Sequence, residues 1–163
     1  MDFKSDEKAF QTLEDLQAYK LAREFRKEMY RVARSLPDFE KFGLASQVRR
    51  AALSLTNNIA EGHGRYHYLD QLKFLLQARG SLEELIDDLN VCVDEEYLPT
   101  ARVNELKDLG WRVHNIINGY GRYLRQRKAG EGLHLKETPI LYFIEEMMIR
   151  SPIWILTVPT GTE

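Results

Sequence analysis

Residues 44–65 read LASQVRRAALSLTNNIAEGHGR, and this stretch decides the fold. Apolar side chains recur in it at steps of three and four, the spacing that places residues on one face of an α-helix; they are Leu44, Val48, Ala52, Leu55 and Ile59. Gly62 and Gly64 follow, and glycine supplies the permissive backbone at which helices commonly end. The stretch therefore predicts an amphipathic helix with its apolar face in a core.

The opposite side of this predicted helix carries hydrogen-bonding side chains, which we name the polar stripe: Gln47, Arg50, Ser54, Asn57 and Glu61. Amide, hydroxyl, guanidinium and carboxylate groups at these spacings can bond to one another or to a neighbouring helix. A solvated outer face is the alternative, although such faces usually favour Lys and Glu, which are scarce here. We expect the polar stripe to seal contacts between helices or between subunits.

Length and composition predict one soluble, cytoplasmic domain with a tail. A chain of 163 residues suits a single domain with a real core, and two domains would be cramped. The formal net charge of −2 argues against a protein that is basic overall, so any contact with nucleic acid requires a local patch. The polar first residues, MDFKSDEKAF, are unlike a signal peptide, and no uncharged apolar run reaches the roughly 18 residues of a membrane-spanning helix.

Three further helices are predicted from apolar periodicity. The first spans about 18–36 and ends at Pro37, the third runs from about 67 or 69 to 93, and the fourth runs from about 103 to 128. Four antiparallel helices joined by short turns form an all-α, up-down-up-down four-helix bundle, which we assign to residues 1–128.

Two details of the third predicted helix concern its packing. We expect Asp88 to face outward with Glu84, Asp87 and Glu95. Gly80 lies near the middle of the helix, where a glycine costs on the order of 1 kcal/mol relative to alanine. We therefore expect a close helix crossing at Gly80 that offsets this cost.

The remaining residues, 129–163, are predicted to be a linker and a C-terminal extension. Residues 129–132 read AGEG, a linker composition, and the segment after them is rich in aromatic and aliphatic side chains and in proline. We predict a short helix at 140–149 and an extended segment at 153–158. Such apolar content should dock on the bundle, on another subunit or on a partner, and the sequence does not choose among these.

The first predicted helix carries the longest stripe of like charge in the chain, which we name the basic stripe: Lys20, Arg23, Lys27, Arg31 and Arg34. Glu24 and Glu28 flank it, at spacings that allow Glu24 to pair with Lys27 and Glu28 with Arg31. The basic stripe is either a solvated surface or a face that contacts phosphate groups or a partner. The acidic outer face of the third helix could also meet it in a neighbouring subunit.

No template for enzymatic chemistry fits the chain. It contains no phosphate-binding glycine loop, dinucleotide fingerprint or nucleophile elbow. His63 and His67 lie four residues apart near Glu61, but the adjacent glycines break the helix that would present them to a metal ion together. Cys92, on an apolar helical face, is predicted to be a buried reduced thiol. An enzyme that uses Glu61, Arg50 and His63 remains an alternative, and we expect no enzymatic activity, no cofactor and no metal.

Residues 42–65, FGLASQVRRAALSLTNNIAEGHGR, together with ARGSLEEL at 78–85, LEDLQAYKLA at 13–22 and SLP at 35–37, resemble a known family. It is the family of bacterial four-helix-bundle proteins associated with 23S ribosomal RNA intervening sequences, and the resemblance extends from about Leu13 to Leu124. This family is broadly related to the accessory variability determinant of diversity-generating retroelements, a pentameric barrel that binds a reverse transcriptase and nucleic acid. The resemblance implies a homo-oligomer, a pentamer, without enzymatic activity of its own.

Sixteen positions carry the family's signature here: Ser46, Gln47, Arg49, Arg50, Ala51, Ser54, Asn58, Ile59, Ala60, Glu61, Gly62, Gly64, Arg65, Gly80, Ser81 and Glu84. Two neighbouring positions depart from the family's commoner pattern, which has proline where Thr56 stands and alanine where Asn57 stands. These departures make the helix more regular and more polar in this chain. The tail after Gly130 has no counterpart in the family's pattern.

Two functions follow from the residues and the resemblance together. The first is a nonenzymatic, homo-oligomeric scaffold that binds RNA or single-stranded DNA through basic stripes repeated around a ring, since repetition strengthens a modest patch. The second is a protein-binding adaptor, for example an accessory subunit of a reverse transcriptase, that docks through the C-terminal tail or the first helix.

Overall fold

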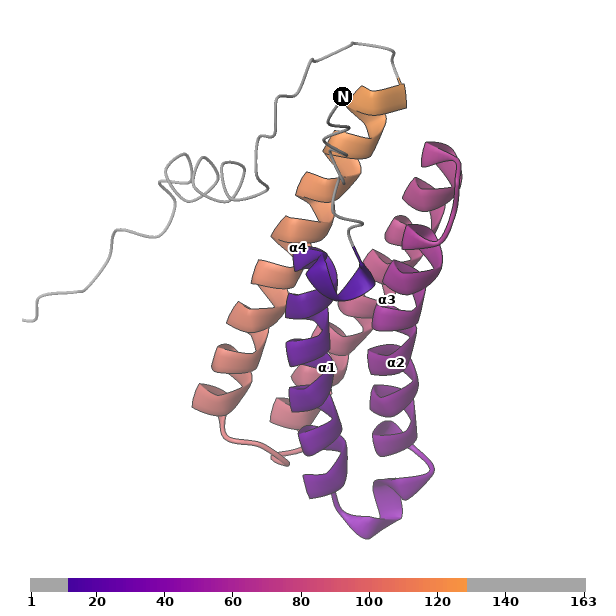
Figure 1. Ribbon diagram of the computed structural model, residues 1–163. Coiled ribbons are helices and arrows are strands. Elements are labelled where there is room, and N and C mark those ends of the chain that lie inside the picture. Colours follow the sequence, from indigo (N-terminus) through magenta and orange to yellow (C-terminus); the bar gives the residue numbers. More distant parts are fainter. Residues whose placement is uncertain (1–11, 129–163) are drawn as a thin grey trace, which may run out of the picture. The chain divides into compact units, whose positions relative to one another are not determined.

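The computed structural model describes residues 12–128. They form two short 3₁₀ helices and four α-helices, in the order η1 (Leu13–Asp15), α1 (Gln17–Ser35), η2 (Asp38–Lys41), α2 (Leu44–His63), α3 (Tyr68–Asp94) and α4 (Thr100–Lys128). Successive α-helices run in opposite directions, and each packs against its neighbours in the chain, with α4 returning to α1 (Figure 1). The predicted up-down-up-down four-helix bundle is confirmed.

The core is built from the apolar faces that the sequence pattern predicts. On α2, Val48, Ala52, Leu55 and Ile59 are buried, while Leu44 at the first turn is partly exposed. The other helices contribute large, fully buried side chains, among them Phe25, Met29, Leu82, Leu85, Leu89, Val103, Leu106, Ile117 and Leu124. Each large apolar side chain in such a position stabilises the fold by roughly 1.5–3 kcal/mol relative to exposure. The four apolar faces therefore hold the bundle together.

Two glycines allow close helix packing, and neither is the one that the sequence pattern indicated. A Cβ atom added to Gly62 of α2 would lie 3.2 Å from the backbone oxygen of Gln71 in α3. A Cβ atom added to Gly110 of α4 would lie 2.7 Å from Cδ1 of Ile86 in α3. Gly80 is instead exposed, and a Cβ atom there would meet no atom within 4 Å. The predicted crossing at Gly80 is wrong within one subunit, because this side of α3 points away from the bundle.

Glu40 of η2 joins the two turns at one end of the bundle. Its Oε2 atom accepts a hydrogen bond from the backbone nitrogen of Leu44 at 2.8 Å, which satisfies one of the free amides at the start of α2. Its Oε1 atom accepts a hydrogen bond from the hydroxyl group of Tyr97 at 3.0 Å, in the turn between α3 and α4. One carboxylate thus holds both connections.

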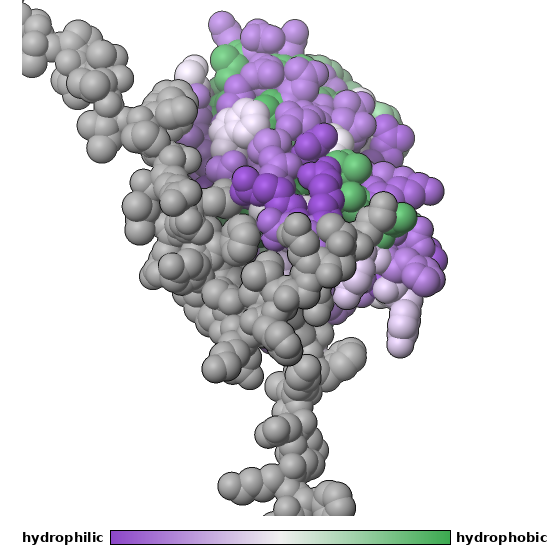
Figure 2. Space-filling view, turned by 90° about the horizontal axis from the view of Figure 1, so that it is seen from above, coloured by the Kyte–Doolittle hydropathy of each residue, from purple (hydrophilic) through white to green (hydrophobic). Residues whose placement is uncertain are grey.

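The surface of the described residues is mainly polar where Figure 2 shows it. In this view from above, hydrophobic residues form small areas among hydrophilic ones. No helix in residues 12–128 is both long and apolar enough to cross a membrane. The predicted linker at 129–132, short helix at 140–149 and extended segment at 153–158 lie outside the described residues.

Candidate nucleic-acid interface

An open groove of about 500 Å³ lies between α1 and α2. Four basic side chains, one aromatic ring and one aliphatic side chain line it: Arg26, Lys27, Arg31, Arg34, Tyr30 and Leu53. The five lining residues of α1 recur at steps of four or beside such positions, so they share one face of the helix. No acidic side chain belongs to this lining. We name this feature the basic groove.

Arg26 is tied to α2 at the edge of the basic groove. Its Nη1 atom donates a hydrogen bond to Oγ1 of Thr56 at 2.9 Å, and the buried hydroxyl group of Thr56 donates in turn to the backbone oxygen of Leu53 at 3.2 Å. Thr56 therefore supplies the acceptor that orients Arg26 beside Leu53.

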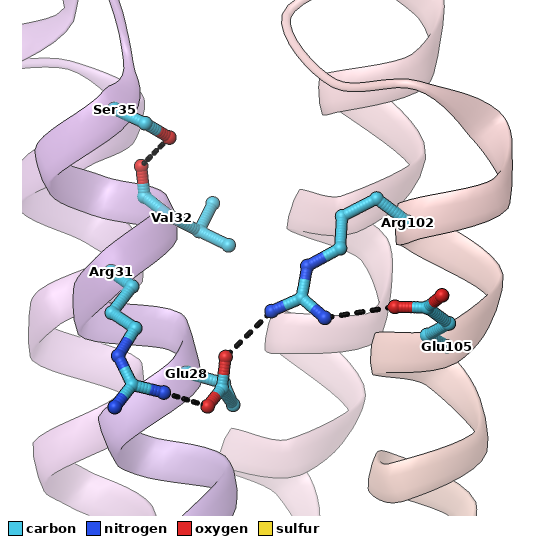
Figure 3. A network of polar contacts seen from close by, with 6 residues as sticks. All are labelled: Glu28, Arg31, Val32, Ser35, Arg102 and Glu105. Atoms are coloured by element: carbon cyan, nitrogen blue, oxygen red, sulfur yellow. Dashed lines mark hydrogen bonds and ion pairs between the residues drawn. The ribbon is translucent and has the colours of Figure 1, made fainter.

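Arg31 belongs to a chain of four charged side chains that connects α1 to α4 (Figure 3). It pairs with Glu28, as the spacing predicts, and Glu28 also accepts a hydrogen bond from Nη2 of Arg102 at 2.6 Å. Arg102 in turn pairs with Glu105 at 2.9 Å. The two guanidinium and two carboxylate groups cancel in charge, so Arg31 adds less positive potential to the basic groove than the other cations add.

The basic stripe of the sequence overlaps the basic groove over part of its length. Lys27, Arg31 and Arg34 line the groove. Lys20 and Arg23 are exposed on α1 and continue the stripe toward the start of the helix, beyond the groove lining. The structure therefore gathers three of the five predicted residues around one concave surface.

Three lining residues were outside the predicted basic stripe: Arg26, Tyr30 and Leu53. Arg26 precedes Arg34 by eight residues with Tyr30 midway, and this spacing was the available signal. This spacing alone does not single out Arg26, because α1 lines a groove along that edge only where α2 packs beside it. Leu53, which is 43% exposed, lies on the outer side of α2, where apolar periodicity places no core residue.

The polar stripe of α2 divides between two environments, and its first part contacts α3. Gln47 donates a hydrogen bond from Nε2 to Oδ1 of Asp88 at 3.1 Å. Ser54 accepts a hydrogen bond from the hydroxyl group of Ser81 at 2.8 Å. These residues therefore join two helices of one subunit.

The second part of the polar stripe faces away from α3. Glu61 forms an ion pair with Arg65 one turn later on the chain. Arg50 and Asn57 are exposed. Contacts of these residues with a second subunit stay a prediction.

The predicted outward position of Asp88 is wrong, because its side chain is only 3% exposed. It lies three residues after Leu85 and four before Cys92, both fully buried, so it shares their face of α3. Its Oδ2 atom has no hydrogen-bond partner among the described residues. Burial raises the pKa of Asp88 to about 6; the hydrogen bond from Gln47 opposes the rise, and nearby acidic side chains add to it.

Within the described part of the chain, the thiol is buried and the histidines do not belong to a group of three or more metal-binding side chains. Cys92 is free and buried, as predicted, and burial raises its pKa to about 11, so the thiol is protonated near neutral pH. Within residues 12–128, no three or more His, Cys, Asp or Glu side chains are grouped to hold a metal ion. His63 ends α2 and His67 precedes α3, so the turn separates them. The absence of enzymatic activity stays a prediction.

These features define a class, the antiparallel four-helix bundles with short connections, here with four basic side chains around one groove of a chain whose formal net charge is −2. The chain belongs to the 23S rRNA-intervening sequence protein family, whose model matches residues 14–119. The match includes the basic groove and the polar stripe, and it ends before the last residues of α4. No curated protein matches the chain. The family resemblance is confirmed, and the broader relation to retroelement proteins stays a prediction.

Proposed function

We propose that this protein is a nonenzymatic, homo-oligomeric helical scaffold that binds RNA or single-stranded DNA through the basic groove. The observation that carries the proposal is the gathering of four basic side chains around Tyr30 and Leu53 in one open groove. Lys and Arg neutralise phosphate groups, and an aromatic ring in such a groove offers a surface on which a base can stack. The family's name refers to an intervening sequence of 23S rRNA, which favours RNA as the ligand.

Binding by one subunit should be weak and strongly dependent on salt. The chain has a formal net charge of −2, and Glu28 largely compensates Arg31, which leaves Arg26, Lys27 and Arg34 as the main cations of the groove. Each phosphate contact to a single strand contributes about −0.7 to the slope of log affinity against log salt, so three contacts correspond to a slope of about −2 per groove. In the homopentamer that the resemblance implies, several grooves on one particle would raise the effective concentration of the ligand.

Fluorescence anisotropy with a labelled single-stranded RNA, at low and at physiological salt, tests the proposal. The variant Lys27→Glu/Arg34→Glu should bind at least about tenfold more weakly, because two attractive contacts become repulsive. The matched control is Arg112→Glu/Arg125→Glu, which changes the net charge equally at exposed positions of α4. Equal losses in both variants would indicate a general charge effect, and absence of binding to RNA and to DNA at low salt would overturn the proposal.

A protein-binding adaptor is the second candidate, and exposed aromatic rings at the connection between α1 and α2 favour it. Phe39 and Phe42 are 75% and 88% exposed. The Phe39 ring packs edge-on against Tyr97, and Nζ of Lys41 lies 5.5 Å from the centre of the Phe42 ring. Exposed aromatic side chains commonly anchor protein interfaces.

The adaptor candidate has a separate test. A reverse transcriptase gene with template repeats beside the gene for this protein would favour it and would supply the partner for a binding measurement. The variant Phe39→Ser/Phe42→Ser should then lose that partner and keep its affinity for RNA. Loss of the partner in Lys27→Glu/Arg34→Glu instead would move the docking surface to the basic groove.

A further inference from the structure

The lining of the basic groove consists of two sets of residues that differ in chemistry and exposure. Arg26 and Tyr30 of α1 are partly buried, and Leu53 adds an aliphatic side chain from α2. We name these three residues the inner lining. The other three lining residues are cations that are exposed on α1. The groove therefore offers aromatic and apolar surface beside one partly buried guanidinium group, with further positive charge at its edge.

Arg26 is held in one orientation by α2. Its Nη1 atom donates a hydrogen bond to Thr56 at 2.9 Å, and Thr56 is itself bonded to the backbone oxygen of Leu53. Within residues 12–128, Thr56 is the hydrogen-bond partner of Arg26, so the Nε and Nη2 groups on the other edge of the guanidinium remain as a pair of parallel donors. A fixed pair of donors requires two adjacent acceptors, and this requirement makes the contact selective.

The surroundings of this donor pair favour a nucleobase over a phosphate group. Phosphate groups remain in water and are neutralised by exposed cations, which the edge of the groove supplies. Tyr30 follows Arg26 by one turn on the same face of α1, so a base that stacks on the Tyr30 ring directs its edge toward Arg26. Leu53 offers apolar contact from α2. The groove volume of about 500 Å³ is in the range typical of small-molecule sites.

Guanine is the base whose edge matches a pair of donors. Its O6 and N7 atoms are adjacent acceptors, and arginine binds both in the commonest specific contact between proteins and DNA bases. Adenine instead has an amino group beside N7, and this group would meet the donors of Arg26 with a third donor. Uracil has a single acceptor, O4, on the corresponding edge.

We infer that Arg26 makes the basic groove selective for guanine in a single strand, with the base stacked on Tyr30 and its O6 and N7 atoms bound by Arg26. The inference rests on the proposed function, since it requires nucleic acid in the groove, and it names the base that the groove prefers. Lys27 and Arg34 then bind neighbouring phosphate groups without regard to sequence. Thr56 is a positioning residue, because it acts on the ligand through Arg26.

Fluorescence anisotropy at low salt, with short labelled oligouridine RNAs that carry one guanosine in the middle, tests the inference. Replacement of the guanosine by adenosine, cytidine or uridine should weaken binding about fivefold, the lower end of what a bidentate contact contributes to discrimination between bases. 7-Deazaguanosine, which has a carbon in place of N7, should also bind more weakly than guanosine. Inosine, which keeps both O6 and N7, should bind as guanosine does.

The variant Arg26→Lys separates the donor pair from the charge. Lysine keeps the positive charge and lacks the planar fork, so the variant should bind uridine-only RNA as the wild type does and lose most of the preference for guanosine. Arg23→Lys, at an exposed position of α1 beyond the groove lining, is the matched control and should keep the preference. Thr56→Val should lower the preference by about twofold, since the fork remains but is no longer oriented.

The outcomes distinguish this inference from the proposed function. Equal affinities for all the substituted RNAs, or a preference for guanosine that Arg26→Lys keeps in full, would overturn the inference and leave a groove that binds nucleic acid without regard to sequence. An equal loss of affinity for the uridine-only and guanosine RNAs in Arg26→Lys would assign Arg26 to a phosphate contact and would also overturn it. Absence of binding to every RNA would overturn the proposed function as well.

Discussion

The α2 helix has two flanks, one packed against α1 and one packed against α3, and the two differ in how exposed their polar side chains are. Toward α1, charged side chains line an open groove, and Arg26 at its edge donates a hydrogen bond to the buried hydroxyl group of Thr56. Toward α3, polar side chains bond across the contact, and Gln47 donates a hydrogen bond to the buried carboxyl group of Asp88. Gly62 brings these two helices together. We name the contact between α2 and α3 the closed boundary, and the contact between α1 and α2, with its groove, the open boundary.

The difference suggests that the closed boundary stabilises the fold and that the open boundary is available to a ligand. A buried carboxyl group with one unpartnered oxygen opposes folding in its charged form, whereas exposed cations around a groove cost the subunit little. A ligand that carries phosphate groups can therefore bind at the boundary with α1 without breaking a contact that holds the fold. Three changes test this comparison, in order of expected effect.

The largest effect is expected for Asp88→Asn at the closed boundary. The pKa of Asp88 is raised from 3.8 to about 6 in the folded protein, so the folded state holds this proton more tightly than the unfolded state. The contribution of this group is most favourable below about pH 4, is lost as the pH rises toward 6 and is constant above. Asp88→Asn should therefore be more stable than the wild type at pH 7, on the order of 2–3 kcal/mol, since one pKa unit corresponds to about 1.4 kcal/mol.

Urea unfolding at pH 4 and pH 7 measures this change. The gain of Asp88→Asn over the wild type should be present at pH 7 and small at pH 4. Asp87→Asn, at the exposed neighbouring position, is the control and should show little difference at either pH. A gain that is equal at both pH values would mean that the carboxyl group of Asp88 does not titrate in this range.

A smaller effect is expected for Gly62→Leu, which should force α2 and α3 apart. The added side chain would begin 3.2 Å from both the Gln71 oxygen and Cβ of Phe74. Overpacking of this kind should lower the free energy of unfolding by about 2 kcal/mol, as measured by urea titration. Gly80→Ala, at the open glycine of α3, should instead raise it by up to about 1 kcal/mol. Equal effects of the two changes would contradict the close packing at Gly62.

The smallest effect is expected at the open boundary, for Thr56→Val. The substitution preserves the shape of the side chain and removes the hydroxyl group that accepts the hydrogen bond from Arg26. The free energy of unfolding should fall by about 1 kcal/mol, because Arg26 can be solvated in the groove. Affinity for single-stranded RNA should stay within about twofold of the wild type, as Arg26 keeps its charge. A loss of stability as large as that of Gly62→Leu would show that this boundary is not the less constrained one.

The periodicity of apolar residues predicted the four helices and their order, because burial of one face is what the spacing of Val48, Leu55 and Ile59 records. Asp88 was predicted to face outward because of its charge. Its helical spacing from the buried residues Leu85 and Cys92 would have placed it correctly on the inward face. The chemical nature of a side chain and its helical position can disagree, and here position decided burial.

The candidate site was less predictable, for a different physical reason. A stripe on α1 can be read from spacing, so Lys27, Arg31 and Arg34 were found. A groove, however, depends on which helix lies beside the stripe and at what rotation, and no local pattern contains that information. Arg26 and Leu53 lie opposite each other only after α1 and α2 have packed. The pairing of Arg31 with Glu28 follows from local spacing, whereas the link from Glu28 to Arg102 joins residues more than seventy positions apart and could not be read from it.

The carboxylate of Glu40 has a consequence for local motion. It is bonded to the amide of Leu44 and to the hydroxyl group of Tyr97, which is 57 residues away in sequence. Fraying of the start of α2 and loosening of the turn after α3 therefore release the same group, so the two events should favour each other. In amide hydrogen exchange, the two connections should behave as one cooperative unit. Phe39 and Phe42 would then be presented to solvent on an end of the bundle that opens as a whole or not at all.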